Sequence, residues 1–278
     1  MRTLILGSTG TVGSALLAAA DARHWPATGT CYRGMNRLCP AVDVRDADAL
    51  NELIADYQPD ATVCAAPIDD PADAARLAKV VRANGGLLAV FTSEAVYGDC
   101  KVAMREDDPL AAVSEAGRHQ ASVEAAVRAE LPDRHLVLRT SWVFDGGRFG
   151  RVGRVLHRLR KGEAVRADNE RFALPTFADD LAEVTLDLLG HGHTGTFNAV
   201  GPDRHTEFTF ARLVAHLFGY DADLIQPTKG EVRPPRVMLD RFRLRALLGA
   251  NAFRPAGEAL RAVRRGLGEW NRLAVQAA

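Results

Sequence analysis

Short apolar runs alternate with amphipathic segments through the first half of the chain. The continuous apolar runs predict strands, because a strand covered on both faces needs apolar residues at every position. The segments between them carry apolar residues at helical spacing, as in Leu50, Leu53, Ile54 and Tyr57. The predicted strands are Thr3–Leu6, Thr28–Tyr32, Ala61–Ala65, Leu87–Ser93 and His135–Thr140, and the predicted helices are Thr11–Ala22, Ala47–Tyr57, Pro71–Asn84 and Ser114–Glu130. This alternation favours an α/β protein with a doubly wound parallel sheet of the Rossmann type.

The pattern changes after about Thr140, where glycines and prolines interrupt the chain. Helical spacing returns in separate pieces, and one more apolar run, Phe197–Val200, predicts a strand. The helical pieces are Arg151–Lys161, Asp179–Leu189, Glu207–Leu217, Asp240–Leu248 and Glu258–Ala278. We therefore expect a dinucleotide-binding domain over residues 1–145, completed by segments near 177–200, and a smaller, mostly helical substrate-binding lobe over residues 146–278.

A glycine-rich turn joins the first predicted strand to the first predicted helix. Glycines allow a tight turn and a close approach of the backbone to a diphosphate, and the following helix offers free N–H groups and a partial positive charge. The residues expected to hold the diphosphate are Gly7, Thr9, Gly10, Thr11, Val12 and Gly13. A tight turn in another kind of α/β protein is the alternative, but the order of strand, turn and helix favours a dinucleotide site.

The end of the second predicted strand bears on the choice of cofactor. An acidic residue there would bind the ribose 2′-hydroxyl of NAD, whereas this chain has Arg33. An arginine can pair with a 2′-phosphate, so the sequence favours NADP over NAD unless Arg33 is an ordinary exposed arginine. Asp43 and Val44 follow the next apolar run and are further cofactor candidates, although Asp43 could instead cap a helix or lie on the surface. Ala65 and Ala66 would leave room for a flat ligand, or could serve tight packing.

The composition is that of an ordinary globular protein of 278 residues, with 47% hydrophobic residues. Lys and Arg balance Asp and Glu at 35 each, which argues against a nucleic-acid binder held by bulk charge. No apolar run is long enough to cross a membrane and the N-terminus lacks a signal-peptide shape, so we expect a cytoplasmic protein. The four cysteines form no Cys-x-x-Cys pair, and His191 and His193 have no apparent third ligand, so we expect reduced cysteines and no metal site.

Several motifs, in order along the chain, carry a resemblance to a known family. They are Gly7–Gly13, Cys64–Ala66, Thr92–Gly98, Leu138–Phe144, Leu174–Thr176 leading to Asp180–Ala182, and the C-terminal stretch Arg236–Gly249. On these motifs the chain resembles the extended short-chain dehydrogenase/reductase superfamily, and within it the branch of dTDP-4-dehydrorhamnose reductase and related nucleotide-sugar enzymes. The resemblance covers most of the chain. It implies a nicotinamide dinucleotide cofactor and a small-molecule substrate such as a nucleotide sugar.

The catalytic pair that this resemblance implies is missing. The superfamily uses a Tyr-x-x-x-Lys pair on the long helix after the Ser93 strand, where the tyrosine transfers the proton and the lysine lowers the tyrosine pKa and binds the nicotinamide ribose. This chain has the orienting serine, Ser93, but Ala116 stands in place of the tyrosine and Gln120 in place of the lysine. Gln120 is therefore expected beside the cofactor without the lysine's charge.

Three residues are candidates for the missing proton donor. Tyr97 is a phenol close to Ser93, although the resemblance gives its position a structural role. Glu94 corresponds to a carboxylate that nucleotide-sugar dehydratases of the superfamily use as an acid, although an exposed or salt-bridged glutamate is the alternative. His119 titrates in the useful range, but one step along a helix from Gln120 turns it away from the cleft.

Three functions stay open on this evidence. The first is a reductase or epimerase of a nucleotide sugar or similar carbonyl compound with atypical proton transfer, in which Arg139, Trp142, Pro175 and Thr176 border the substrate cleft. The second is a catalytically silent, cofactor-binding regulatory subunit or sensor, like the non-catalytic subunit of methionine adenosyltransferase. The third is a non-redox lyase or dehydratase that uses Glu94. A homodimer or a partner enzyme stays open as well.

Overall fold

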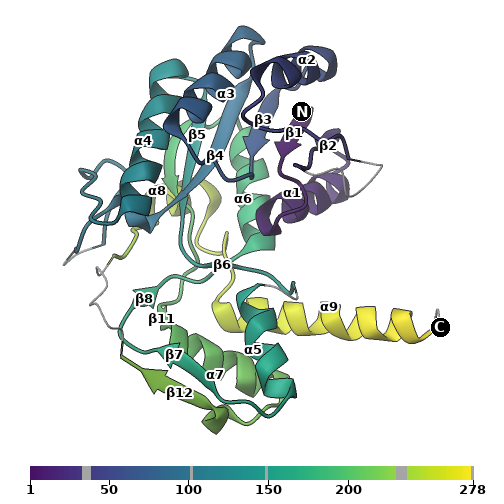
Figure 1. Ribbon diagram of the computed structural model, residues 1–278, viewed down its shortest axis with the longest axis vertical. Helices are drawn as coiled ribbons and strands as arrows, with labels where there is room; N and C mark the ends of the chain where they lie inside the picture. Colours follow the sequence, from purple (N-terminus) through teal and green to yellow (C-terminus); the bar gives the residue numbers. More distant parts are fainter. Residues whose placement is uncertain (33–38, 101–102, 148–149, 230–236, 277–278) are drawn as a thin grey trace.

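A parallel sheet forms the body of the computed structural model, which describes residues 1–32, 39–100, 103–147, 150–229 and 237–276, with side chains as far as residue 267. The sheet has six strands, and their order is β10-β5-β4-β3-β1-β2 (Figure 1). The strands are β1 (Thr3–Leu6), β2 (Ala27–Gly29), β3 (Ala61–Cys64), β4 (Leu87–Ser93), β5 (His135–Thr140) and β10 (Gly195–Asn198). The doubly wound Rossmann-type fold expected from the alternating pattern is confirmed.

Helices cover both faces of this sheet. On one face, α1 (Thr11–Ala22) and α6 (Ala178–Gly190) pack against each other and the strands, and on the other α3 (Pro71–Ala83) packs between α2 (Ala47–Tyr57) and α4 (Glu115–Glu130). Each face has its own apolar core. Strands β1, β3 and β5 are buried along their whole length, which is why they read as continuous apolar runs.

The first strand marks the point where a ligand is expected. β1 pairs with β2 on one side, Leu4 opposite Thr28, and with β3 on the other, Leu6 opposite Cys64. The chain thus leaves β1 in one direction and later returns to pair on its opposite side. In open α/β sheets such a switch point leaves a crevice at the carboxyl ends of the strands, which here begins at Gly7.

The second lobe is built mainly from α5 (Arg151–Arg160), α7 (Glu207–Phe218) and α9 (Ala256–Gln276), below the sheet in Figure 1. Its core contains Phe144, Phe177 and Phe210. The lobe also contains short strand pairs that the sequence did not predict: β7 (Val165–Asp168) with β12 (Ile225–Thr228), β8 (Phe172–Ala173) with β11 (His205–Thr206), and β6 (Val143–Phe144) with β9 (Thr176–Phe177). Two 3₁₀ turns, η1 (Glu94–Val96) and η2 (Ala222–Leu224), complete the described elements.

The chain returns to the sheet near its C-terminal end. In α8 (Phe242–Leu248), Leu244 is buried in the same core as α1 and α6. Arg243 lies over the Phe197 ring and donates to the carbonyl oxygens of Thr196, at 2.9 Å, and Thr194, at 3.4 Å. These carbonyls belong to edge strand β10 and the residue before it. Among the described residues, no helix is both long enough and apolar enough to span a membrane.

Candidate functional site

The glycine turn after β1 has the backbone geometry that the sequence predicts. Gly7 has φ +79°, and a Cβ there would lie 2.6 Å from the backbone nitrogen of Ala66. A Cβ on Gly13 would lie 2.2 Å from the Gly7 carbonyl oxygen, so side chains are excluded at both positions. The helix α1 begins after Gly10 without a side-chain cap. Its N-terminal N–H groups therefore fit an anionic group, and the turn fits a dinucleotide diphosphate.

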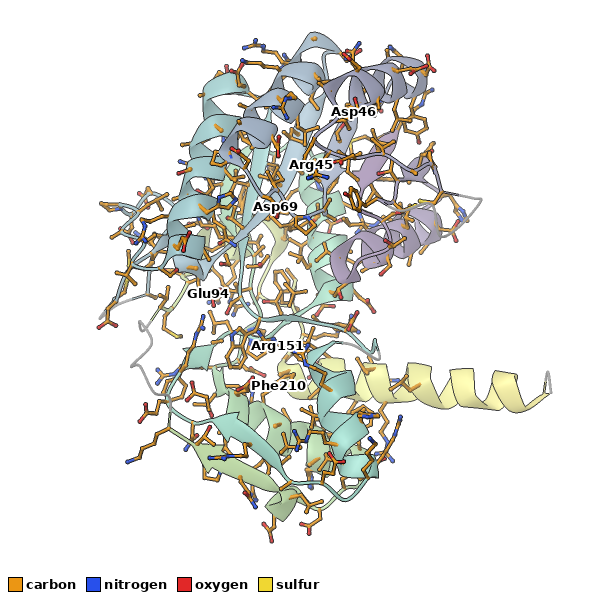
Figure 2. The ribbon with its side chains drawn as sticks, in the orientation of Figure 1. Arg45, Asp46, Asp69, Glu94, Arg151 and Phe210 are labelled. Carbon is orange, nitrogen blue, oxygen red and sulfur yellow. The ribbon has the colours of Figure 1, made fainter. Side chains whose placement is uncertain are left out.

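A cavity of about 270 Å³ lies beside this turn. It brings together four of the residues expected to bind cofactor, from β1, the end of β3 and the loop before α2. The lining residues are Gly7, Tyr32, Val42, Asp43, Val44, Arg45, Ala66, Pro67 and Asp69. Arg45 and Asp69 lie above the interlobe region in Figure 2. Arg33, on which the preference for NADP rests, lies outside the described residues.

Asp43 lines this cavity and is paired with Arg45. Arg45 donates to its carboxylate from Nε, at 2.9 Å, and from Nη2, at 2.7 Å, and these hydrogen bonds hold the pKa of Asp43 below its ordinary value. The same guanidinium donates to the Tyr32 hydroxyl at 2.9 Å and lies over the Tyr32 ring. Asp46, not Asp43, caps α2. Sequence reasoning missed Arg45 and Tyr32, which only the folded loop brings to this cavity.

Ser93 and Gln120 meet where the catalytic pair was expected. Ser93, at the end of β4, donates from Oγ to Oε1 of Gln120 on α4 at 2.7 Å. Ala116 lies one turn earlier on α4 and is exposed. The amide of Gln120 thus takes the lysine position as a neutral hydrogen-bonding partner of Ser93, and Ala116 presents only a methyl group.

Tyr97 has a structural place, which corrects its expected catalytic role. The side chain is fully buried. Its hydroxyl donates to the carbonyl oxygen of Arg105 at 2.6 Å and accepts from Arg139. Burial raises the pKa of Tyr97 to about 12, which makes it a poor source of protons near neutral pH.

Arg139 also departs from its expected role as a substrate contact. Its side chain is buried and donates to both carboxylate oxygens of Glu124, from Nε at 3.0 Å and Nη2 at 2.7 Å. Glu124 accepts further from the Thr92 hydroxyl, at 2.7 Å, and from Arg128. This ion-pair network fastens α4 to β4 and β5, so Arg139 is a structural residue.

The Pro175–Thr176 segment is buried as well. The Thr176 hydroxyl donates to the Leu174 carbonyl and accepts from the Gly201 N–H, so its side chain does not face a substrate cleft. Its backbone N–H donates to the Trp142 carbonyl oxygen at 3.2 Å. The expected substrate contacts at Pro175 and Thr176 are corrected to positioning roles behind Trp142.

Glu94 is a buried carboxyl group at the junction of the two lobes (Figure 2). It begins η1, directly after Ser93, and its side chain is only 10% exposed. Arg171, from the turn between β7 and β8, approaches Oε1 at 3.5 Å from the other lobe. Burial raises the pKa of Glu94, although hydrogen bonds from its own backbone N–H and the Ser141 hydroxyl and the charges of Arg171 and Arg151 oppose the shift. Such a group can hold a proton where an exposed glutamate could not.

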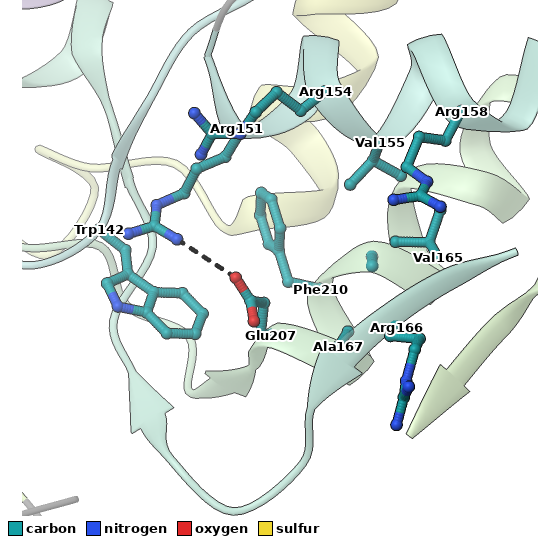
Figure 3. Close-up of a pocket in the computed structure, with 11 residues that line it drawn as sticks. Trp142, Arg151, Arg154, Val155, Arg158, Val165, Arg166, Ala167, Glu207 and Phe210 are labelled. Carbon is teal, nitrogen blue, oxygen red and sulfur yellow. Dashed lines mark ion pairs between the residues drawn. The ribbon is translucent and has the colours of Figure 1, made fainter. Parts of the chain in front are cut away.

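A second cavity, of about 290 Å³, opens in the substrate lobe (Figure 3). Its apolar side chains include Val155, Val165, Ala167, Phe210 and Ala211, and its basic ones are Arg151, Arg154, Arg158 and Arg166. The guanidinium of Arg151 lies 4.7 Å from the centre of the Trp142 ring and 3.7 Å from the Glu207 carboxylate. An apolar pocket with several arginines fits a flat ring joined to an anionic group.

Trp142 lines this cavity in an unusual backbone conformation. Its φ is +36°, a value that costs a bulky residue about 1–3 kcal/mol and persists only where the surroundings hold it. The Thr176 N–H and the Arg151 guanidinium supply such contacts. Trp142, one of the four residues expected to contact substrate, lines this cavity. Among the described residues, no group of three or more His, Cys, Asp or Glu is arranged to hold a metal ion.

Comparison with known proteins adds to this geometry. A family described as the RmlD substrate binding domain matches residues 1–241. The chain is 27% identical over 281 residues to the probable low-salt glycan biosynthesis reductase Agl14 of Haloferax volcanii, covering 90% of this chain and 93% of that protein. It is 26% identical over 275 residues to methionine adenosyltransferase 2 subunit beta of Pongo abelii, covering 88% and 82%.

A solved structure has the same fold. The crystal structure of dTDP-4-dehydrorhamnose reductase from Bacillus anthracis in complex with NADP superposes with a TM-score of 0.85 at 16% identity. The match covers 95% of this chain and 99% of that one. The likeness therefore extends over both lobes.

Proposed function

Because the chain belongs to the RmlD substrate binding domain family, we propose that it is an NADP-dependent reductase of a nucleotide sugar or similar anionic carbonyl compound, with Glu94 as its proton donor. The observation that carries this proposal is the buried Glu94 carboxyl, next to Ser93 and paired with Arg171 of the other lobe, at the junction of the lobes in Figure 2. The relatives support the substrate class, since Agl14 is named a reductase and the Bacillus anthracis protein a dTDP-4-dehydrorhamnose reductase with NADP.

The glycine turn and the cavity beside it support the binding of NADP. Gly7 and Gly13 exclude side chains where a diphosphate would lie, and the α1 N-terminus offers it N–H groups. Gln120 lies where a lysine would bind the nicotinamide ribose, and its amide can still donate to a ribose hydroxyl. When bound, NADPH supplies a hydride to the substrate carbonyl carbon.

In this proposal Glu94 donates the proton. A protonated carboxyl can transfer its proton to the carbonyl oxygen as that oxygen gains negative charge, while the Ser93 hydroxyl can turn from Gln120 to donate to the same oxygen. The Glu94 carboxylate that remains is stabilised by Arg171. Arg171 is partly exposed, so solvent can return the proton along this side.

The proposed substrate class is based on the cavity that Arg151 lines. Trp142 and Phe210 offer apolar surface for a base, and the arginines offer positive charge for phosphates. Burial lowers the pKa of Arg151, with help from the like charges of Arg154 and Arg171. An anionic substrate would relieve the repulsion among these arginines, and this relief would favour its binding.

Mixing the protein with NADPH and a dTDP-4-keto-6-deoxy sugar tests the proposal. We expect NADPH oxidation, and Glu94→Gln should lower kcat by about 10²–10⁴-fold because the general acid is lost. The Kd for NADPH should stay the same. Glu52→Gln, a charge-matched change on the exposed side of α2, should leave kcat unchanged.

A cofactor-binding regulatory subunit is the second candidate function, favoured by Ala116 and Gln120 in place of the catalytic pair and by the likeness to methionine adenosyltransferase 2 subunit beta. Tight NADPH binding without oxidation by any 4-keto nucleotide sugar would support it and contradict the reductase. The double variant Ala116→Tyr, Gln120→Lys would then show whether the rest of the pocket is competent. A cofactor that keeps one redox state through turnover would point instead to a lyase or dehydratase that uses Glu94.

A further inference from the structure

A carboxylate already lies at the start of the helix that is expected to face the dinucleotide diphosphate. Asp145 follows β6 at the junction of the two lobes, and its Oδ2 accepts from the Thr11 hydroxyl at 3.0 Å. Thr11 is the first residue of α1 and comes directly after the glycine turn. The negative charge of Asp145 is therefore fixed beside the end of α1 that attracts anions.

The turn that follows Asp145 holds this carboxylate in place. The Gly147 N–H donates to Oδ1 at 3.0 Å. Gly150, the N-cap of α5, leaves room for it, because a Cβ there would lie 2.5 Å from Oδ1. Asp145 thus lies at the N-terminal ends of both α1 and α5, where helix dipoles favour a negative charge.

Neighbouring acids increase the negative charge at this place. The pKa of Asp179, near the start of α6, is raised by burial first and then, against Arg254, by nearby carboxylates that include Asp145. Arg254 is itself paired with Asp180. A diphosphate that approaches the α1 N-terminus therefore meets a repulsive carboxylate as well as the attractive N–H groups.

We propose that Asp145 is an internal anion that competes with the dinucleotide diphosphate for the N-terminal end of α1. The inference rests on the proposed dinucleotide site. Binding has to displace the Asp145 side chain from Thr11 or bear its repulsion, so Asp145 weakens the affinity for the cofactor and favours its release. Its role is to set affinity, whereas the glycine turn provides the site.

Asp145→Asn tests the proposal, because the charge is gone while the one remaining oxygen can still accept from Thr11; the amide nitrogen cannot accept from the Gly147 N–H, so that hydrogen bond is lost. We expect the Kd for NADPH, measured by calorimetry on the full chain at low salt, to fall by about three- to tenfold. The ratio of wild-type to variant Kd should approach one at about 1 M salt, where the Debye length is about 3 Å. Asp223→Asn makes the same change in net charge at a side chain that is 89% exposed, and should leave the Kd unchanged.

The outcomes separate the alternatives. If Asp145 only supports the two helix ends, Asp145→Asn lowers the Tm without cofactor and leaves the Kd equal or weaker at every salt concentration, and the proposal is overturned. If NADPH and NADH both fail to bind the wild type and every variant, the dinucleotide assignment fails and this proposal falls with it. Binding by Asp145→Asn alone would support both.

Discussion

Glu94 and Glu124 are both buried carboxyl groups near the end of β4, but their surroundings assign them different tasks. Glu124 accepts hydrogen bonds from two arginines and the Thr92 hydroxyl, so its negative charge is compensated by two positive ones. Glu94 has one ion-pair partner among the described residues, Arg171 of the other lobe at 3.5 Å, and its carboxyl is otherwise met by neutral groups, the Ser141 hydroxyl and its own backbone N–H. A fully paired carboxylate fixes structure, whereas a weakly paired one can exchange a proton.

The raised pKa of Glu94 predicts a pH-dependent stability. Between the ordinary value of 4.5 and the raised one, the folded protein binds more protons than the unfolded chain, so the free energy of unfolding falls as pH rises through this window. Glu94→Gln removes the titration. Its free energy of unfolding relative to wild type should therefore increase from acid toward neutral pH, as measured by urea denaturation across a pH series. A constant difference between the two proteins would contradict the assignment.

Single residues were predictable from the sequence where a local motif fixed them. Ser93 and Gln120 could each be assigned a position by the motif around it, whereas the hydrogen bond between them came from the structure. The resemblance already gave Tyr97 a structural role beside the catalytic one, but Arg139 could not be placed, because its role depends on Glu124, which only tertiary packing brings within reach. A buried ion pair leaves no local sequence signal, so Arg139 was expected to border the substrate cleft.

At the scale of elements, α4 links the candidate site to the sheet. Its N-cap Ser114 accepts from the Gly117 N–H, its middle presents Gln120 to Ser93, and its second half carries Glu124. A Cβ on Gly117 would lie 2.0 Å from the Ala95 carbonyl oxygen, so the helix start packs directly on η1. The position of Gln120 therefore depends on how firmly the first turn of α4 is held.

Removing this cap should destabilise the protein in a specific way. Ser114→Ala leaves one N–H of the first turn without its partner, and we expect the free energy of unfolding to fall by about 1 kcal/mol. Ser122→Ala, on the exposed side of the same helix, is the control and should change it by less than about 0.5 kcal/mol. Urea denaturation measures both. Equal effects at the two positions would show that the Ser114 hydroxyl does not act as a cap.

Helices were predictable to within one or two residues because their apolar spacing persists over several turns. The short strands of the substrate lobe were not. β8 and β11 contain two residues each, too few for an alternating pattern, and β12 contains Pro227. These strands exist because the lobe folds them against α7, and that is a property of the tertiary structure.

For the whole molecule, the two lobes meet at the site itself. The Glu94–Arg171 pair connects the sheet domain to the other lobe. The Thr11–Asp145 hydrogen bond connects it to the segment that joins the two lobes. The alternating pattern predicted the sheet and its helical covers. It could not predict that Glu94 would lie at the junction, because the partner that identifies it is 77 residues away.

A bound dinucleotide should stabilise the entire fold by mass action. At about 100 times its Kd, NADPH is expected to raise the free energy of unfolding by about 2.7 kcal/mol, provided that it binds the folded state alone. Thermal unfolding with increasing NADPH measures this, with adenosine as a control ligand that lacks the diphosphate. A Tm that responds to neither NADPH nor NADH would contradict dinucleotide binding.

The guanidinium of Arg243 has a consequence for how copies of the protein meet in solution. β10 ends the sheet, and an uncovered outer strand is a template on which a foreign strand can add. By accepting from Arg243, the carbonyls of Thr194 and Thr196 are already occupied on that side, and a charged group stands where an intruding backbone would have to dock. The Arg243 side chain therefore disfavours the addition of a strand from another copy at this edge of the sheet.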